Sequence, residues 1–252
     1  MSTLFQFKQF AVDQAYCAMK VNTDGVLLGA CATNNILGDD TEKTTDISGN
    51  ATTHFLDIGT GTGVIALMLA QRFPQAQIDG VEIDKLAATT AAVNFQASPF
   101  AHRLKAFPLN IEHYFMVYPD KKFDLVVTNP PFFIDSLKSA EKAKETARHT
   151  DLSFFKNLCH SVASQLTPTG RFYIILPLDT ALLIQQIAEL EGLFVHEILN
   201  IYSYKHSNPH RQIISFGLWE KEIDYNDLVI YESEKVYTAA YKSLLKNFLT
   251  IF

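Results

Sequence analysis

The sequence has little cysteine, no long apolar run and no excess of basic residues. Its three cysteines, Cys17, Cys31 and Cys159, are scattered without a CxxC pair, so neither a disulfide framework nor a zinc site is predicted. No segment approaches the roughly 18 consecutive apolar residues of a membrane helix. The first ten residues also lack the apolar run of a secretory signal. We therefore expect a cytoplasmic protein that binds neither a metal nor a membrane.

The net charge of −6 argues against a general nucleic-acid-binding surface, because phosphate contacts usually rely on surplus Lys and Arg. Half of this charge lies between Thr33 and Thr53, where Asp, Asn, Thr, Ser and Gly replace almost all apolar residues. Such a composition predicts a mobile acidic loop, 33–53, inside one domain rather than a domain boundary. Half of the negative charge that argues against a nucleic-acid partner therefore belongs to this loop and not to the rest of the chain.

Strand and helix patterns alternate after this loop. Short apolar strands are expected at 55–58, 77–81, 104–108, 123–128 and 171–176, followed by two more at 194–202 and 212–219. With 252 residues, 48% of them hydrophobic, the chain can bury one full α/β core. The alternation predicts a doubly wound, mostly parallel sheet that binds ligands at the carboxyl ends of its strands.

A glycine-rich turn follows the first of these strands. It reads Asp57-Ile58-Gly59-Thr60-Gly61-Thr62-Gly63, and a helix begins at once. Glycines let the backbone turn sharply and let a ligand approach closely. A dinucleotide fingerprint needs its third glycine where this chain has Val64, which disfavours a nicotinamide cofactor. Glu82, at the end of the next strand, can accept both hydroxyls of a ribose, so a bound cofactor is favoured over a purely structural turn.

The central strand ends in Thr128-Asn129-Pro130-Pro131-Phe132-Phe133. Two consecutive prolines cannot continue a sheet ladder, because neither has an N–H to donate, and they stiffen the loop. The corner therefore offers the Asn129 amide oxygen, rigid backbone carbonyls and the flat ring of Phe132. This equipment suits a planar group that carries an exocyclic amine, such as adenine. The alternative is a strand-ending turn with a phenylalanine in the core.

Together, the glycine loop, Glu82 and the Asn-Pro-Pro-Phe corner resemble the class I amino-group methyltransferases. The N-terminal blocks Phe7-Lys8-Gln9-Phe10 and 17–25 resemble, more narrowly, the bacterial tRNA1(Val) adenine-37 N6-methyltransferase family. Ala147-Arg148-His149 and the strand after Arg211 fit that family too. The resemblance implies a single Rossmann-like domain over 1–252, with a mostly parallel seven-stranded sheet, a C-terminal antiparallel strand and an N-terminal extension, 1–32, that covers substrate and cofactor.

The same resemblance implies a site, a cofactor and a partner. The cofactor is S-adenosyl-L-methionine, and the substrate is the anticodon loop of tRNA1(Val), bound by a monomer. Cofactor contacts are expected from Asp57, Gly59, Gly61, Gly63, Glu82, Asn110 and Asn129. Catalysis is expected at Asn129, Pro130, Pro131 and Phe132, and RNA contacts at Lys8, Lys20, Arg148 and Arg211. Asn110 stands where the family often carries Asp. Its oxygen can still accept from the adenine amine, but a turn-forming Asn is nearly as good an explanation.

Other functions share parts of this pattern. A guanine-N2 methyltransferase of ribosomal RNA and a glutamine-N5 protein methyltransferase also use an Asn-Pro-Pro corner. A cofactor-binding module without activity would not need Asn129 and Pro130. Two basic clusters could meet phosphates, one with Arg148 and one with Arg211, although a mixed or short basic stretch is equally typical of a solvated surface.

Overall fold

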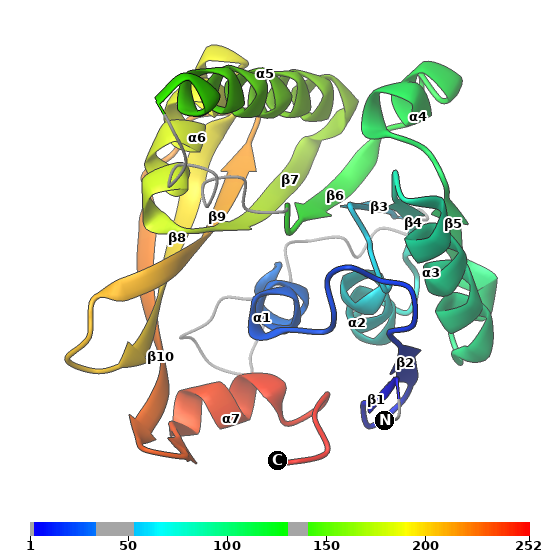
Figure 1. Ribbon diagram of the computed structural model, residues 1–252, viewed down its shortest axis with the longest axis vertical. Coiled ribbons are helices and arrows are strands. Elements are labelled where there is room, and N and C mark those ends of the chain that lie inside the picture. Colours follow the sequence, from blue (N-terminus) through cyan, green and yellow to red (C-terminus); the bar gives the residue numbers. More distant parts are fainter. Residues whose placement is uncertain (1–2, 34–52, 131–140) are drawn as a thin grey trace.

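The computed structural model describes residues 3–33, 53–130 and 141–252, with side chains omitted for 141–151, and its centre is one large sheet (Figure 1). The sheet has nine strands in the order β11-β10-β8-β9-β7-β6-β3-β4-β5. Their bounds are β3 His54–Ile58, β4 Gln77–Val81, β5 Leu104–Phe107, β6 Phe123–Thr128, β7 Leu166–Leu176, β8 Phe194–Tyr204, β9 Pro209–Gly217, β10 Asp224–Ser233 and β11 Val236–Tyr237.

The doubly wound, mostly parallel sheet is confirmed. Strands β5, β4, β3, β6 and β7 run parallel to one another, and β9 lies antiparallel between β7 and β8. The expected number of strands is wrong, because β10 and β11 extend the outer edge beyond β8. The sequence of β10 mixes Asp, Asn and Glu with its apolar residues, so its strand pattern is weak.

Helices cover both faces of the sheet (Figure 1). They are α1 Thr23–Cys31, α2 Val64–Arg72, α3 Lys85–Ala97, α4 Ile111–Val117, α5 Glu141–Gln165, α6 Leu178–Leu190 and α7 Ala239–Leu245, with a short 3-10 turn, η1, at Ala101–Arg103. Buried residues of α1, α2, α3 and α7 join one core and those of α4, α5 and α6 the other. Strand β6 serves both cores, because Val126 faces one and Val127 the other. Within the described chain no helix combines the length and apolar character of a membrane span.

Side chains cap the beginnings of several helices. Asp84 caps α3 by accepting from the Leu86 and Ala87 N–H groups. Asn22 caps α1, since its side chain accepts from Gly25 N. Helix α6 begins directly after Pro177. At the N-terminus, β1 Leu4–Gln6 and β2 Ala11–Asp13 pair in a separate hairpin.

The register of the parallel strands brings their carboxyl ends to one edge. Ile58 at the end of β3 lies between Val81 of β4 and Thr128 of β6. Gly59, Glu82 and Asn129 follow these three residues directly in the chain. Side chains that are far apart in sequence therefore gather at one place, where helices α2 and α3 begin.

Gly63 provides a test of how tightly this edge is packed. It has φ +82°, and a Cβ atom there would lie 2.4 Å from Phe95 Cε1 of α3. Gly63→Ala should lower the free energy of unfolding by about 2–4 kcal/mol, because left-handed strain adds to overpacking. Gly59, with φ +70°, has no described atom within 4 Å of such a Cβ. Gly59→Ala should therefore cost only about 1 kcal/mol. Urea unfolding measures both, and equal losses would contradict the packing argument.

Candidate active site

A cavity of about 510 Å³ opens at the edge where the parallel strands end. This volume lies within the usual range for small-molecule and cofactor pockets. The residues that line it come from the segment before α1, the glycine loop, the ends of β4, β5 and β6, and α5. Among them are Cys17, Ala18, Met19, Lys20, Asn22, Gly59, Gly61, Glu82, Ile83, Asn110, Asn129, Pro130 and Phe154.

Asp57 anchors the glycine loop and the first turn of α2 through hydrogen bonds. Its side chain is fully buried, and Oδ2 accepts from Thr60 Oγ1 at 2.6 Å and from Ala66 N at 3.2 Å. Oδ1 has no hydrogen-bond partner in the described part of the chain. Burial raises the pKa of Asp57 to about 7, against the lowering effect of its two hydrogen bonds. The sequence grouped this residue with the cofactor contacts, but the structure places it beneath the loop and outside the cavity lining.

Glu82 joins the glycine loop to the end of β4. Oε2 accepts from Gly61 N at 3.0 Å, and Oε1 accepts from Asp84 N at 2.9 Å. Each carboxylate oxygen has a further lone pair, so Glu82 can also accept hydroxyl groups from a ligand in the cavity. Ile83 follows it, lines the same cavity and is 71% exposed. The sequence reasoning missed Ile83, although an apolar residue directly after an acid at a strand end was a usable signal.

Asn110 lines the cavity and caps α4. Its Oδ1 accepts from His113 N at 2.7 Å, which confirms that this residue forms a turn. A second lone pair remains on that oxygen, so the contact with an adenine amine stays a prediction.

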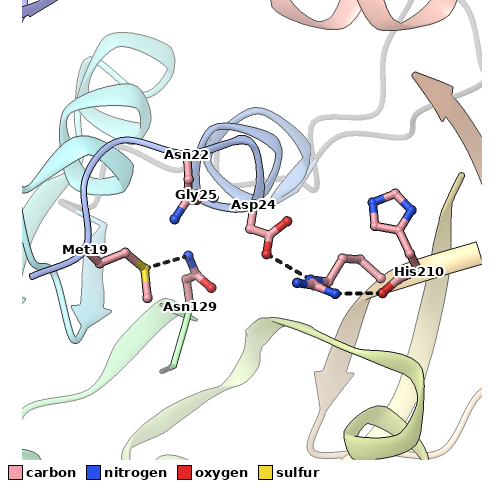
Figure 2. A network of polar contacts seen from close by, with 7 residues as sticks. Met19, Asn22, Asp24, Gly25, Asn129 and His210 are labelled. Carbon is pink, nitrogen blue, oxygen red and sulfur yellow. Dashed lines mark hydrogen bonds and ion pairs between the residues drawn. The ribbon is translucent and has the colours of Figure 1, made fainter. Parts of the chain in front are cut away.

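Asn129 presents an unpaired acceptor at the end of β6. It is 8% exposed, and its Nδ2 lies 3.7 Å from Met19 Sδ, to which it donates (Figure 2). Its Oδ1 is buried and finds no donor among the residues that the structure describes. Leaving a buried acceptor unpaired costs about 1–3 kcal/mol, so such an atom is an expected contact for a ligand. The N-terminus of α1 packs beside this amide, since a Cβ on Gly25 would lie 3.8 Å from Asn129 Nδ2.

The predicted RNA contacts have separate locations. Lys20 lines the cavity. The Lys8 ammonium donates to the carbonyls of Lys246 and Phe252, the latter at 2.7 Å, so it joins the two ends of the described chain and does not line the cavity. These two carbonyls take two of its three N–H donors, and its contact with RNA stays a prediction. Pro131 and Phe132 lie outside the described residues, as does the Arg148 side chain in the first half of α5.

Arg211 forms an ion pair with helix α1, whose N-terminus packs beside Asn129. Its Nε donates to Asp24 Oδ2 at 2.9 Å in an ion pair whose side chains are 26% and 17% exposed (Figure 2). Asp24 stands in the first turn of α1, two residues after the Asn22 cap. The pair therefore fixes the start of α1 to β9, a role that the sequence did not predict for Arg211.

The strand order, the glycine loop and the acid that follows β4 define a class I S-adenosylmethionine-dependent methyltransferase. Two solved structures share this fold. They are a predicted O-methyltransferase from Agrobacterium tumefaciens, with a TM-score of 0.64, 15% identity and coverage of 89% of this chain and 96% of that one, and the delta-N METTL16 MTase domain, with a TM-score of 0.57, 15% identity and coverage of 80% and 85%. At these identities the likeness concerns the fold alone.

Sequence comparison identifies the family within this class of methyltransferases. Residues 43–194 match the family model of the methyltransferase small domain. Two bacterial proteins named tRNA1(Val) (adenine(37)-N6)-methyltransferase align along almost the whole chain. The one from Pedobacter heparinus is 46% identical, covering 100% of both chains, and the one from Porphyromonas gingivalis is 37% identical, covering 98% of this chain and 95% of its own. The chain belongs to the methyltransferase small domain family, and S-adenosylmethionine is its cofactor.

The residues at the cavity fit this cofactor. Gly59 leaves open space above the loop, with no described atom within 4 Å of a Cβ placed there. Glu82 provides carboxylate oxygens for ribose hydroxyls, and Ile83 provides an exposed apolar surface for a flat base.

The raised pKa of Asp57 predicts a pH dependence of stability. The folded-state pKa of about 7 exceeds the ordinary 3.8, so the unfolded chain releases this proton first as the pH rises. The stability that Asp57 contributes is therefore complete below about pH 4 and is lost as the pH rises to about 7. Relative to Asp57→Asn, the wild-type protein should lose at most about 4.4 kcal/mol over this range. Thermal unfolding of both proteins at several pH values measures this difference. A constant difference would show that the buried carboxyl does not titrate.

A double-mutant cycle tests the link between Arg211 and α1. Asp24→Asn and Arg211→Gln should each destabilise the fold, and their coupling energy should be about 1 kcal/mol because the pair is half-buried. Both single variants should also lower methyl transfer, since each loosens the start of α1 beside Asn129. If the two losses of stability simply add, the ion pair does not hold the helix in place.

Proposed function

We propose that this protein transfers the methyl group of S-adenosylmethionine to the exocyclic N6 of adenine 37 in the anticodon loop of tRNA1(Val). The names of relatives that align along the full chain support this substrate. The observation that carries the chemistry is the buried, unpartnered Oδ1 of Asn129 in the wall of the cofactor cavity, judged over the described residues. We further propose that one chain acts alone, since the glycine loop, Glu82 and Asn129 of a single chain line one cavity. We place the protein in the cytoplasm.

The chain's own residues bind and orient the cofactor. When bound, S-adenosylmethionine supplies an electrophilic methyl group on a positively charged sulfur. Glu82 accepts ribose hydroxyls, while Ile83 and Leu109 provide apolar surface for the adenine. The turn from Gly59 to Gly63 lets the ligand approach the backbone closely. Asp57 keeps this loop in shape through Thr60 and Ala66.

Asn129 and Pro130 prepare the amine for attack. The exocyclic nitrogen of adenine is a poor nucleophile because its lone pair is delocalised into the ring. If Asn129 Oδ1 accepts one N–H and the Pro130 carbonyl accepts the other, the nitrogen moves toward a tetrahedral geometry and its lone pair becomes available. Positioning and fixed dipoles then account for the rate. The surplus proton of the methylated nitrogen would pass to water, so no dedicated carboxylate base is required.

Asp57 and Glu82, the acids at the ends of β3 and β4, are already engaged by groups of this chain. Asp57 is outside the cavity lining, and its Oδ2 is engaged by Thr60 and Ala66. Glu82 accepts from two backbone N–H groups at the ribose end. The N2 group of guanine and the side-chain amide of glutamine are planar –NH2 groups of similar geometry. The methylated product must therefore be identified directly. A cofactor-binding module without activity is disfavoured, because it has no use for an unpaired oxygen at Asn129.

Asn129→Ala tests the acceptor. It should lower kcat by at least about 10²–10³, because one of two charge-stabilising acceptors is lost. The affinity for S-adenosylmethionine should be largely kept, since Asn129 acts on the substrate amine. Calorimetry with the cofactor and methyl transfer to tRNA measure the two effects. Asn247→Ala, an exposed position on the C-terminal segment, is the matched control. Wild-type turnover by Asn129→Ala would remove the residue from the mechanism.

The substrate is tested by labelling total RNA from a cell that lacks this protein. The purified protein and labelled S-adenosylmethionine should place label in N6-methyladenosine at one position of tRNA1(Val), as mapped by mass spectrometry. Label in N2-methylguanosine of ribosomal RNA, or in protein, would overturn the proposed substrate.

A further inference from the structure

Tyr16 has a backbone conformation that its side chain disfavours. Its φ is +60°, in the left-handed region, where a residue with a Cβ is strained. The other non-glycine residues with positive φ in the described ranges are Thr33 and Lys235, and Lys235 belongs to the tight turn between β10 and β11. Strained residues of this kind concentrate at functional sites.

The strain is imposed by contacts on either side of Tyr16. Asn94 of α3 accepts from Asp13 N and donates to Asp13 O, both at 2.8 Å. Thr90 Oγ1 donates to Ala15 O at 2.8 Å, and Gln14 Oε1 accepts from Val21 N at 2.8 Å. These bonds hold the main chain on both sides of Tyr16 and do not use its side chain. A glycine or asparagine at this position would satisfy the same bonds with less strain.

The tyrosine ring adds little to the packing of the fold. Tyr16 is 79% exposed, among the most exposed large side chains in the described part of the molecule. The next four residues, Cys17 to Lys20, line the cavity, whereas Tyr16 does not. Tyr16 is therefore connected to the cavity-lining residues through the main chain, and most of its surface is open to solvent. Nothing that the structure describes within this chain accounts for an aromatic residue here.

The surroundings of Tyr16 indicate what the ring contacts. Met19 lies three residues after Tyr16 and contacts the Asn129 amide. Three residues of extended chain span at most roughly 11 Å, so the Cα atoms of Tyr16 and Met19 lie within that distance of each other. Lys20 adds an exposed cation on the same segment. An exposed aromatic ring beside a cation is the arrangement that proteins use to stack unpaired bases and hold their phosphates.

We propose that Tyr16 is an RNA-binding residue whose ring stacks on a nucleobase next to the target base while the target occupies the cavity at Asn129. This inference rests on the proposed function and assigns part of the substrate surface to the segment from Tyr16 to Lys20. Tyr16 does not line the cavity, so its ring acts on the RNA and not on the cofactor.

Tyr16→Leu, Tyr16→Phe and Tyr16→Asn test this role with unmodified tRNA1(Val) transcript. The Leu and Asn variants should raise KM for tRNA about tenfold, because a base–aromatic stack is lost, with little change in kcat. The Phe variant should behave as the wild type. Affinity for S-adenosylmethionine, measured by calorimetry, should be unchanged in all three. Tyr16→Asn should unfold at the same or a higher temperature than the wild type, which separates lost binding from lost folding.

Salt dependence and a distant tyrosine complete the experiment. Tyr16→Leu should leave the slope of log K for tRNA binding against log salt concentration unchanged. Lys20→Gln should reduce the size of that slope by about one, because one phosphate contact is lost. Tyr225→Leu is the matched control, because Tyr225 is 68% exposed and lies near the start of β10, at the opposite edge of the sheet. Wild-type tRNA affinity in Tyr16→Leu, or loss of cofactor affinity instead, would overturn this inference alone. Failure of the wild-type protein to bind and methylate tRNA would overturn the proposed function as well.

Discussion

A buried amide oxygen without a donor is the constraint on which this site depends. The Asn129 oxygen lies at a proline corner, and over the described residues the chain offers it no partner. The Met19 sulfur accepts from Nδ2 of the same amide and so favours the present orientation of the side chain. The start of α1 packs against the same amide at Gly25. A ligand that donates to this oxygen would recover the cost of leaving it unpaired.

The rest of the fold brings this oxygen to the cofactor. Parallel strands end at one edge, so β3 contributes the glycine loop, β4 contributes Glu82 and β6 contributes Asn129. Two apolar cores, one on each face of the sheet, fix the strands that carry these groups. The N-terminal segment then closes one side of the cavity, and the Asp24–Arg211 ion pair fixes its helix to β9. The geometry at the corner thus depends on contacts made far from it in sequence.

The sequence predicted best the features that local chemistry determines. The predicted bounds of β4 and β6 agree with the structure, because apolar runs mark them. Strand β10 was missed because its half-buried pattern contains many polar residues. The partners of Lys8 and Arg211 could not be predicted either. Each is set by segments about 190 or more positions away, which no local pattern reports.

A crystal structure with S-adenosylhomocysteine and adenosine would show whether Asn129 holds the substrate amine. We expect the adenosine N6 to lie within hydrogen-bond distance of Asn129 Oδ1 and the Pro130 carbonyl, with the cofactor sulfur beyond it in line. A sulfur on the other face of the sheet, or an Asn129 oxygen that remains unpaired in that complex, would contradict it.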